Sequence, residues 1–284
     1  MITCNLMGGL GNQLFQIFTV IAHSMQTQNP YLFTDEKSLG AVGNTVRPTY
    51  WDSFLKELKP FLTSQFPQGI QQLRELSFCY NEIPLYMLQN KDVLLFGYFQ
   101  SYKYFQPQAS AIYKMLKIKT QKKHAIEKAG FSKEQLQDTI SMHFRIGDYK
   151  KVSHMHPIMP YEYYENSILF FKQRFPEKVF KILYFCENQD IEEVEEKIQR
   201  LQTRFPSYEF MRASTILEDW EQLLTMSMCK YNIIANSTFS WWSAYLNTYK
   251  DKEVCYPNVW FGDVCNHNTL DLFPNTWMKI NAKY

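Results

Sequence analysis

The stretch VFKILYFCENQDIEEVEEKIQRL (residues 179–201) decides the fold class. Its first part, Val179–Cys186, is an apolar run of the kind found in strands that are buried on both faces. Asp190 and Glu193 then resemble a capping box, which marks the start of a helix. The apolar residues of that helix recur at helical spacing, at Ile191, Val194, Ile198 and Leu201. A buried strand followed by an amphipathic helix predicts a parallel sheet with helices packed on it.

The same alternation of strand and helix continues through the second half of the chain. Further strands are predicted at residues 140–144, 231–236 and 253–257, and further helices at 161–175 and 239–249. Thr215 with Glu218 resembles a second capping box, which predicts the start of a helix that carries Trp220, Leu223, Leu224 and Met228. The second half of the chain is therefore predicted to be a doubly wound α/β domain.

The first half opens with a strand (2–6), a glycine-rich turn, a helix and a second apolar stretch (31–33). This order is the usual entry into a doubly wound domain. The helix carries Leu14, Phe18, Ile21 and Met25 on one face.

The middle of the chain is less regular. Residues 40–90 are rich in prolines and aromatics without a clean period, which predicts short helices and loops. A strand is predicted at 92–100 and a helix at 110–118, followed by a polar connection at 120–138. Two α/β domains are therefore expected, at residues 1–130 and 131–284.

Composition excludes several classes of protein. The 284 residues are 45% apolar and 20% charged, which is enough apolar material for two cores. The net charge of +2 comes from scattered basic residues, so nucleic-acid binding is not expected. The six cysteines lack the spacing of a zinc site, and no apolar run has the length of a transmembrane segment. The N-terminus lacks the features of a signal peptide, and a cytoplasmic location is predicted.

Three loops lie where ligands gather in doubly wound sheets, beyond the carboxyl ends of strands. The first is GGLGNQLFQ (8–16), where Gly9 and Gly11 allow close approach to a ligand at a helix start. Asn12 and Gln13 supply amides that can bind hydroxyls or phosphates. Leu14 breaks the dinucleotide fingerprint and no Gly-Lys-Ser/Thr follows, so neither an NAD site nor a P-loop is indicated. The alternative is an ordinary glycine turn.

The second loop is HFRIGDYK (143–150). Arg145 at a strand end can hold a phosphate through its two-pronged guanidinium. Gly147 allows the chain to turn. Asp148 can fix the arginine, cap a helix or act as a base. The alternative is a salt-bridged strand end without a ligand.

The third loop is NSTFSWWSAYL (236–246). Ser237, Thr238 and Ser240 place three hydroxyls at a helix N-terminus, where backbone N–H groups also point outward. This arrangement predicts a phosphate cradle, although simple N-capping would need only one hydroxyl. Trp241 and Trp242 are predicted to belong to the core rather than to a sugar platform.

In this order and spacing, the three loops are similar to those of the alpha-1,2-fucosyltransferase family. FGYFQSYKYF (96–105) and IMPYEYY (158–164) are further points of similarity. The resemblance spans residues 3 to about 262. It implies a GT-B architecture, in which two Rossmann-like doubly wound domains face a central cleft. Residues 1–130 would bind the acceptor and residues 131–284 the GDP-sugar.

The resemblance implies transfer of L-fucose from GDP-fucose to the 2-hydroxyl of a terminal galactose, with inversion and without a metal or other cofactor. GDP-fucose is then a co-substrate, and a galactose-terminated glycan is the acceptor. The absence of an Asp-x-Asp sequence agrees with metal independence. Without a divalent ion, fixed cations and helix N-termini must stabilise the departing diphosphate.

The resemblance assigns roles residue by residue. Arg145 matches the family's essential arginine, and Asp148 and His143 are the candidate bases. The donor would be bound by Gly9, Gly11, Asn12, Gln13, Glu187, Asn236, Ser237, Thr238, Phe239 and Ser240. Apart from the resemblance, Tyr98, Gln100, His154 and His156 could face the acceptor, although a purely structural role stays open for each of them.

The chain departs from the family pattern at two places. Ile146 stands where the family commonly has a second arginine, for which Lys150 or Lys151 could substitute. Cys186-Glu187-Asn188 stands where Ser-Asp-Asp is typical. Transfer of a related GDP-sugar, another linkage, and a glycan- or nucleotide-binding protein without turnover therefore stay open as alternatives. The sequence does not reveal the natural acceptor or the oligomeric state.

Overall fold

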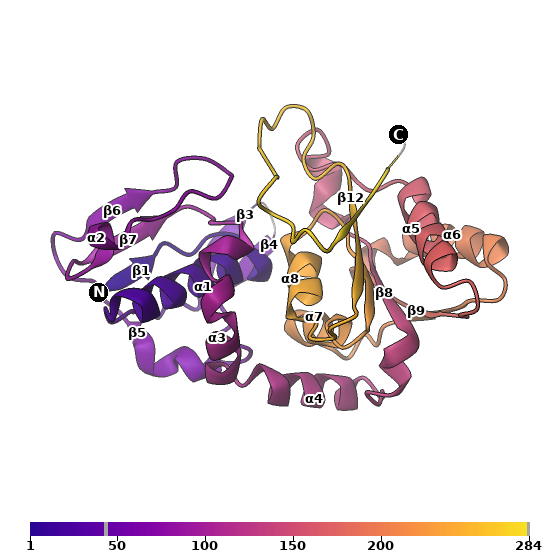
Figure 1. The fold of residues 1–284 in the computed structure, drawn as a ribbon, viewed down its shortest axis with the longest axis horizontal. Coiled ribbons are helices and arrows are strands. Elements are labelled where there is room, and N and C mark those ends of the chain that lie inside the picture. Colours follow the sequence, from indigo (N-terminus) through magenta and orange to yellow (C-terminus); the bar gives the residue numbers. More distant parts are fainter. Residues whose placement is uncertain (43–44, 283–284) are drawn as a thin grey trace. The chain divides into compact units, whose positions relative to one another are not determined.

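A computed structural model describes residues 1–42 and 45–282. The chain forms two compact units (Figure 1). Unit 1 contains Met1–Gln121 and His267–Pro274, and unit 2 contains Lys122–Asn266 and Asn275–Tyr284. The division falls inside helix α4 (Ile118–Lys128), shortly before the boundary predicted after residue 130.

Unit 2 is built on a six-stranded parallel sheet with the order β10-β9-β8-β11-β12-β13. Its strands are β8 (Thr139–His143), β9 (Lys181–Phe185), β10 (Glu209–Arg212), β11 (Tyr231–Ile233), β12 (Glu253–Pro257) and β13 (Met278–Ile280). Counted along the chain from β8, the order is 3-2-1-4-5-6, which is that of the dinucleotide-binding fold. The strand order reverses between β8 and β11, and this topological switch point is where such sheets bind ligands.

Helices cover both faces of this sheet (Figure 1). Side chains alternate along β9, so Ile182 and Tyr184 join one core cluster while Leu183 and Phe185 join another. The first cluster also contains residues of α5 (Tyr161–Arg174) and α6 (Ile191–Arg204), and the second contains Met226 of α7 (Asp219–Met226). Phe239 of α8 (Thr238–Leu246) packs on the second cluster. The unit is therefore doubly wound.

Unit 1 holds a three-stranded parallel sheet with the order β1-β7-β6, on which α1 packs. The elements are β1 (Ile2–Cys4), α1 (Leu10–Thr27), β6 (Gln71–Arg74) and β7 (Val93–Phe96). Two smaller pairs accompany it, parallel β2 (Phe33–Thr34) with β5 (Leu62–Thr63) and antiparallel β3 (Ser38–Val42) with β4 (Thr45–Pro48). The remaining helices are η1 (Lys56–Phe61), α2 (Leu85–Leu88), η2 (Tyr102–Tyr104), η3 (Gln106–Gln108) and α3 (Ala109–Met115).

The predicted α/β class with parallel sheets is confirmed, whereas the GT-B arrangement stays a prediction. Several local predictions were wrong. Strands β3 to β6 lie in the region expected to hold only short helices and loops, and most of α4 occupies the predicted polar connection. Strands β10 and β13 were not predicted.

Both predicted capping boxes were also wrong. Asp190 is the N-cap of α6, but its side chain makes no capping bond there. Its carboxylate instead accepts a hydrogen bond from the backbone N–H of Gly147 at 2.7 Å. The second box is displaced: Glu218, not Thr215, is the N-cap of α7, and its reciprocal partner is Glu221.

Candidate active site

Three loops meet at the carboxyl edge of the unit 2 sheet, because the strands before them are parallel neighbours. The loop after β8 carries Arg145 and Asp148, and the loop after β9 carries Glu187. The loop after β11 carries Asn236 and leads into α8. The motif after β8 and the motif after β11 thus flank the switch point of the sheet.

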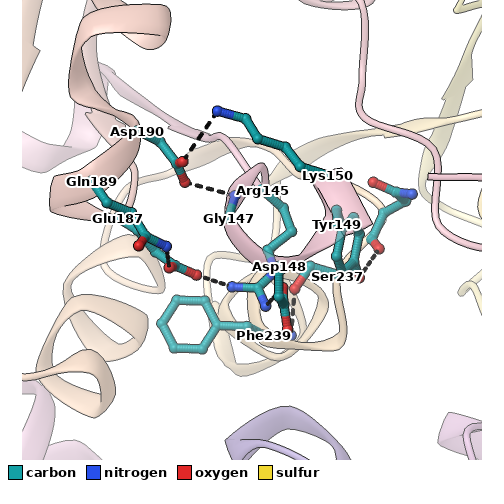
Figure 2. A network of polar contacts seen from close by, with 11 residues as sticks. Arg145, Gly147, Asp148, Tyr149, Lys150, Glu187, Gln189, Asp190, Ser237 and Phe239 are labelled. Carbon is teal, nitrogen blue, oxygen red and sulfur yellow. Dashed lines mark hydrogen bonds and ion pairs between the residues drawn. The ribbon is translucent and has the colours of Figure 1, made fainter. Parts of the chain in front are cut away.

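Arg145 is the centre of a charged network (Figure 2). Its guanidinium forms close ion pairs with Asp148 through Nη2 and with Glu187 through Nη1. The ring of Tyr149 lies under it, with the ring centroid 5.0 Å from Cζ. The arginine side chain is 19% exposed, so a ligand can reach it. Two carboxylates already neutralise this cation, and an anionic ligand must compete with at least one of them.

The short helix η5 (Gly147–Lys151), which follows Arg145, is held by acidic residues at the start of α6 (Figure 2). The Gly147 N–H donates to Asp190, as above, and the ammonium of Lys150 lies 2.9 Å from Glu193 and 3.8 Å from Asp190. Lys150 is therefore directed towards α6. Gly147 has a φ of +25°, and a Cβ there would lie 2.9 Å from Glu187 Oε2. A glycine at this turn gives Glu187 the space to reach Arg145.

The loop after β11 is held by its own polar groups. Ser237 is the N-cap of α8 and accepts a hydrogen bond from Phe239 N at 3.3 Å. Ser240 is fully buried, and its hydroxyl donates to the carbonyls of Ala235 and Ser237. The Asn236 amide donates to the carbonyls of Pro157 and Trp260 at 2.8 and 3.2 Å. Ser237 therefore acts as an N-cap, as the alternative to a phosphate cradle predicts. Thr238 and Phe239, the first two residues of α8, are only partly buried.

The tandem tryptophans that follow are both fully buried, with ring centroids 5.3 Å apart. The prediction that Trp241 and Trp242 belong to the core is therefore confirmed.

His143 lies at the end of β8 and is buried, with the ring of Phe239 5.5 Å from its own. Burial, followed by the charge of Arg145, lowers the pKa of His143 to about 3. Its Nδ1 is buried without a hydrogen-bond partner among the residues described. A neutral imidazole with so little affinity for protons is a weak general base. Of the two candidate bases, Asp148 is the one that a ligand can reach, because it is partly exposed.

The predicted acceptor histidines differ in their surroundings. His156 stacks on Tyr149, with ring centroids 5.0 Å apart, and the Tyr149 hydroxyl donates to the Asn236 carbonyl at 3.0 Å. Tyr149 therefore links the loop after β8, the loop after β11 and His156. His154 is exposed, and its carbonyl abuts Gly262, where a Cβ would lie 2.0 Å away. Tyr149 was not predicted as a site residue, although it lies inside the motif HFRIGDYK.

Of the predicted residues of unit 1, Gln13, Asn12 and Gln100 lie together at the amino end of α1. Gln13 is buried, and its amide donates to the carbonyls of Gly8 and Pro48 at 3.1 and 2.9 Å. Gln100 is also buried and donates to Asn12 Oδ1 at 3.0 Å. These amides hold the glycine loop in shape. Tyr98 is exposed, at 38%.

Arg47, which was not predicted as a site residue, approaches this loop. A Cβ built on Gly9 would lie 3.4 Å from its Nη1. Gly9 and Gly11 flank the first residue of α1, Leu10, so a guanidinium lies next to the helix N-terminus. No motif surrounds Arg47 in the sequence, and only the fold brings it to the loop.

Among the residues described, no three histidine, cysteine, aspartate or glutamate side chains gather so that they could hold a metal ion. Within residues 1–42 and 45–282, no helix combines the length and apolar character needed to cross a membrane.

The family described as "Glycosyl transferase family 11" matches residues 1–281. The O-antigen biosynthesis glycosyltransferase WbnK of Escherichia coli is 34% identical over 146 residues, which are 50% of this chain and 45% of that protein. This alignment therefore spans less than half of the relative's length.

Two further relatives align over more of their length. An alpha-1,2-colitosyltransferase of Escherichia coli is 27% identical over 98% of both chains. A galactoside 2-alpha-L-fucosyltransferase of Caenorhabditis elegans is 22% identical over 99% of this chain and 79% of its own length.

Proposed function

Because the chain belongs to glycosyl transferase family 11, as its three motifs predicted, we propose that it transfers L-fucose from GDP-fucose to the 2-hydroxyl of a terminal galactose. The transfer inverts the anomeric carbon of fucose. The observation that carries this proposal is the position of Arg145, partly exposed at the switch point of a parallel sheet. The enzyme is a glycosyltransferase of the alpha-1,2-fucosyltransferase type.

Transfer of fucose from GDP-fucose requires a cation beside the departing diphosphate. When the bond between fucose C1 and the phosphate oxygen breaks, its electron pair stays on the β-phosphate of GDP. Arg145 can bind that growing charge through two parallel hydrogen bonds. The N-terminus of α8, with Thr238 and Phe239 at its tip, contributes backbone N–H groups and the positive end of the helix dipole. Glu187 lies beside these groups and would contact the donor.

Binding of the diphosphate would rearrange the carboxylates around Arg145. The guanidinium holds Asp148 and Glu187 in this structure, and the diphosphate would replace one of them. Asp148, displaced from the cation, could then accept the proton of the attacking 2-hydroxyl. The base is thereby coupled to the presence of the donor. Gly9, Gly11, Asn12 and Gln13 are proposed to bind the donor from unit 1, and Tyr98, Gln100, His154 and His156 to contact the acceptor.

Colitose transfer is the second candidate. It is favoured by the relative described as an alpha-1,2-colitosyltransferase, which aligns over 98% of the chain. Colitose lacks the 3-hydroxyl of fucose. A site that hydrogen-bonds a substrate hydroxyl rejects the analogue without it, whereas an apolar site discriminates weakly. Competition between GDP-fucose and GDP-colitose therefore separates the two candidates. GDP-mannose serves as the control for a related GDP-sugar.

The test of the proposed function is GDP release on mixing the protein with GDP-fucose, a metal chelator and lactose, with the product linkage read by NMR. GDP release with a new alpha-1,2-fucosyl linkage supports the donor, the regiochemistry and metal independence together. GDP release only after a divalent metal is added would overturn the role given to Arg145. Donor binding without turnover on any galactoside would favour the binding-protein alternative. A cytoplasmic location stays a prediction, which fractionation of cells would test.

A further inference from the structure

The aromatic ring of Tyr149 is an uncharged partner of Arg145. The centroid of this ring lies 5.0 Å from Cζ of Arg145, so the guanidinium sits over the ring. A cation over the face of an aromatic ring is attracted by the negative charge of that face. The contact leaves the N–H groups at the edge of the guanidinium to other partners, which here are Asp148 and Glu187.

The position of this ring is fixed by its surroundings. Tyr149 belongs to η5, and its backbone N–H donates to the carbonyl of Ile146 at 2.8 Å. The imidazole of His156 stacks on the ring at a centroid distance of 5.0 Å and an interplanar angle of 26°. The ring of Phe261, which follows β12, lies 5.5 Å from that imidazole. The tyrosine ring is therefore held through its own backbone and by further aromatic contacts.

The hydroxyl of Tyr149 fixes a second part of the site. It donates to the carbonyl of Asn236 at 3.0 Å, and this carbonyl belongs to the peptide bond that leads into Ser237, the N-cap of α8. The amide side chain of Asn236 holds the same residue through the carbonyls of Pro157 and Trp260. One side chain thus connects the arginine to the start of the helix, the two groups proposed to bind the diphosphate.

Donor binding would change the carboxylate contacts of Arg145 but not its contact with Tyr149. A diphosphate needs the same N–H groups that Asp148 and Glu187 occupy, so at least one of these ion pairs must break. A guanidinium held only by carboxylates would lose its orientation while these partners are exchanged. The ring acts on the face of the guanidinium and does not compete with an anion for N–H groups. Tyr149 is therefore the partner that can stay in place throughout the exchange.

We infer that Tyr149 is a positioning residue for the transfer reaction. Its ring holds the guanidinium of Arg145 in the orientation that the β-phosphate requires, and its hydroxyl keeps the start of α8 at a fixed distance from that guanidinium. The inference rests on the proposed function, and it adds to that function a residue that acts through Arg145 without touching either substrate. Leaving-group stabilisation then depends on the orientation of the cation as well as on its charge.

Tyr149→Leu removes the ring, whereas Tyr149→Phe removes only the hydroxyl. A displacement of about 1 Å can cost about 100-fold in rate, so we expect kcat to fall by about 10- to 100-fold in Tyr149→Leu. Tyr149→Phe keeps a ring under the cation and should stay within about fivefold of the wild-type kcat. A kcat of Tyr149→Leu within about threefold of wild type, or a kcat of Tyr149→Phe as low as that of Tyr149→Leu, overturns the inference.

The matched control is a cation–π pair of the same unit that lies outside the three loops. Cζ of Arg200 lies 3.7 Å from the ring centroid of Tyr161, the first residue of α5. Tyr161→Leu removes that ring and should leave kcat within about twofold of wild type. The melting temperatures of the two leucine variants measure what each ring contributes to stability. An equally large fall of kcat in Tyr161→Leu would indicate a general effect on the fold and overturn the inference.

Nucleotide binding tests the role of Tyr149 without turnover. GDP carries the β-phosphate that Arg145 is proposed to bind and GMP lacks it, so calorimetry with both nucleotides isolates this contact. Wild type should bind GDP at least about tenfold more tightly than GMP, and Tyr149→Leu should reduce this ratio by about fivefold or more. Equal losses of affinity for GDP and GMP in Tyr149→Leu would indicate a structural role only and overturn the inference. Equal affinities of wild type for the two nucleotides overturn it as well.

A double-mutant cycle shows whether Tyr149 acts through Arg145. Arg145→Lys keeps the positive charge but loses the planar guanidinium that lies over the ring. It should lower the affinity for GDP by about tenfold in the wild-type background, but by less than about threefold in Tyr149→Leu, where the orientation is already lost. Effects that multiply within about twofold overturn the inference. If Tyr149→Leu does not fold, Tyr149→Met replaces it in every assay, because an unbranched side chain fills irregular space.

The nucleotide measurements also separate this inference from the proposed function. A selective loss of GDP affinity in Tyr149→Leu supports the positioning of Arg145 even if no fucose is transferred to lactose. Unchanged GDP affinity in Tyr149→Leu overturns the inference even if transfer by wild type is observed.

Discussion

Replacement of Arg145 by alanine should remove transfer while leaving the fold intact. The guanidinium is the shared partner of Asp148 and Glu187, so its loss leaves two carboxylates facing the incoming diphosphate. Removing one preorganised donor to a developing oxyanion lowers kcat by about 10²–10³, or about 2.7–4 kcal/mol. Here the local charge also becomes more negative, so we expect at least the upper end of this range.

The stability effect should be far smaller. Partly exposed ion pairs contribute about 0.2–1 kcal/mol each, which corresponds to a change in Tm of a few degrees in a chain of this size. The relief of repulsion in an Arg145→Ala/Glu187→Gln double variant should recover part of the GDP affinity, but not kcat.

The assay is single-turnover transfer from GDP-fucose to lactose, with GDP affinity measured by calorimetry and Tm by differential scanning. Lys150→Ala is the matched control, because this cation lies on the same turn but pairs with Glu193. It should change kcat by less than tenfold. If Arg145→Ala keeps kcat within tenfold of wild type at an unchanged Tm, leaving-group stabilisation by this residue is refuted.

Three further perturbations follow from buried or strained groups. In the unfolded chain His143 becomes protonated below about pH 6.5, whereas in the folded protein its pKa is about 3. The free energy of unfolding should therefore decrease as the pH is lowered from 6.5 to 3, by up to about 5 kcal/mol. Urea titrations at pH 7 and 4.5 should show a smaller difference in unfolding free energy between the two pH values for His143→Leu than for wild type. An equal difference in both proteins would contradict this prediction. Burial lowers the pKa of Lys122 to about 7, so the unfolded state binds more protons above that pH and stability should rise from pH 7 towards 10. Lys122→Met should reduce this rise, and exposed Lys123→Met should not. Gly147→Ala should lower the unfolding free energy by about 1–2 kcal/mol, because residue 147 has a φ of +25°. The new Cβ should also displace Glu187 and so raise the KM for GDP-fucose. An unchanged KM would argue against a contact between Glu187 and the donor.

The residues around Arg145 could be found from the sequence because they follow strands whose apolar runs are unambiguous. β8, β9 and β11 are almost wholly buried, so their ends, and the polar residues just beyond them, are visible in the pattern. What the pattern could not show is which groups pair. Asp190 has the spacing of a capping residue, yet its carboxylate binds the Gly147 N–H, a contact that exists only once β8 and β9 are side by side.

Other elements gave no periodic signal. β10 is a partly exposed edge strand, and β13 has only its last residue, Ile280, buried. Contacts between elements gave no signal either. Glu75 follows β6, whose residues are largely exposed, and its hydrogen-bond partner Tyr98 lies beyond a separate strand. Only the pairing of β6 with β7 brings these residues together.

The segment His267–Pro274 leaves unit 2 and returns to it before β13, while its own contacts are in unit 1. There the carboxylate of Asp271 forms an ion pair with Lys103, its backbone carbonyl accepts a hydrogen bond from the Ser101 hydroxyl, and the ring of His267 stacks on Phe78. A chimera that exchanged halves between family members by one crossover near residue 121 would give unit 1 a foreign copy of this segment. Recombination between relatives should therefore keep residues 267–274 with the parent of unit 1. A crossover scheme that ignores this rule would put the ion pair between Asp271 and Lys103 at risk even where both parents fold well.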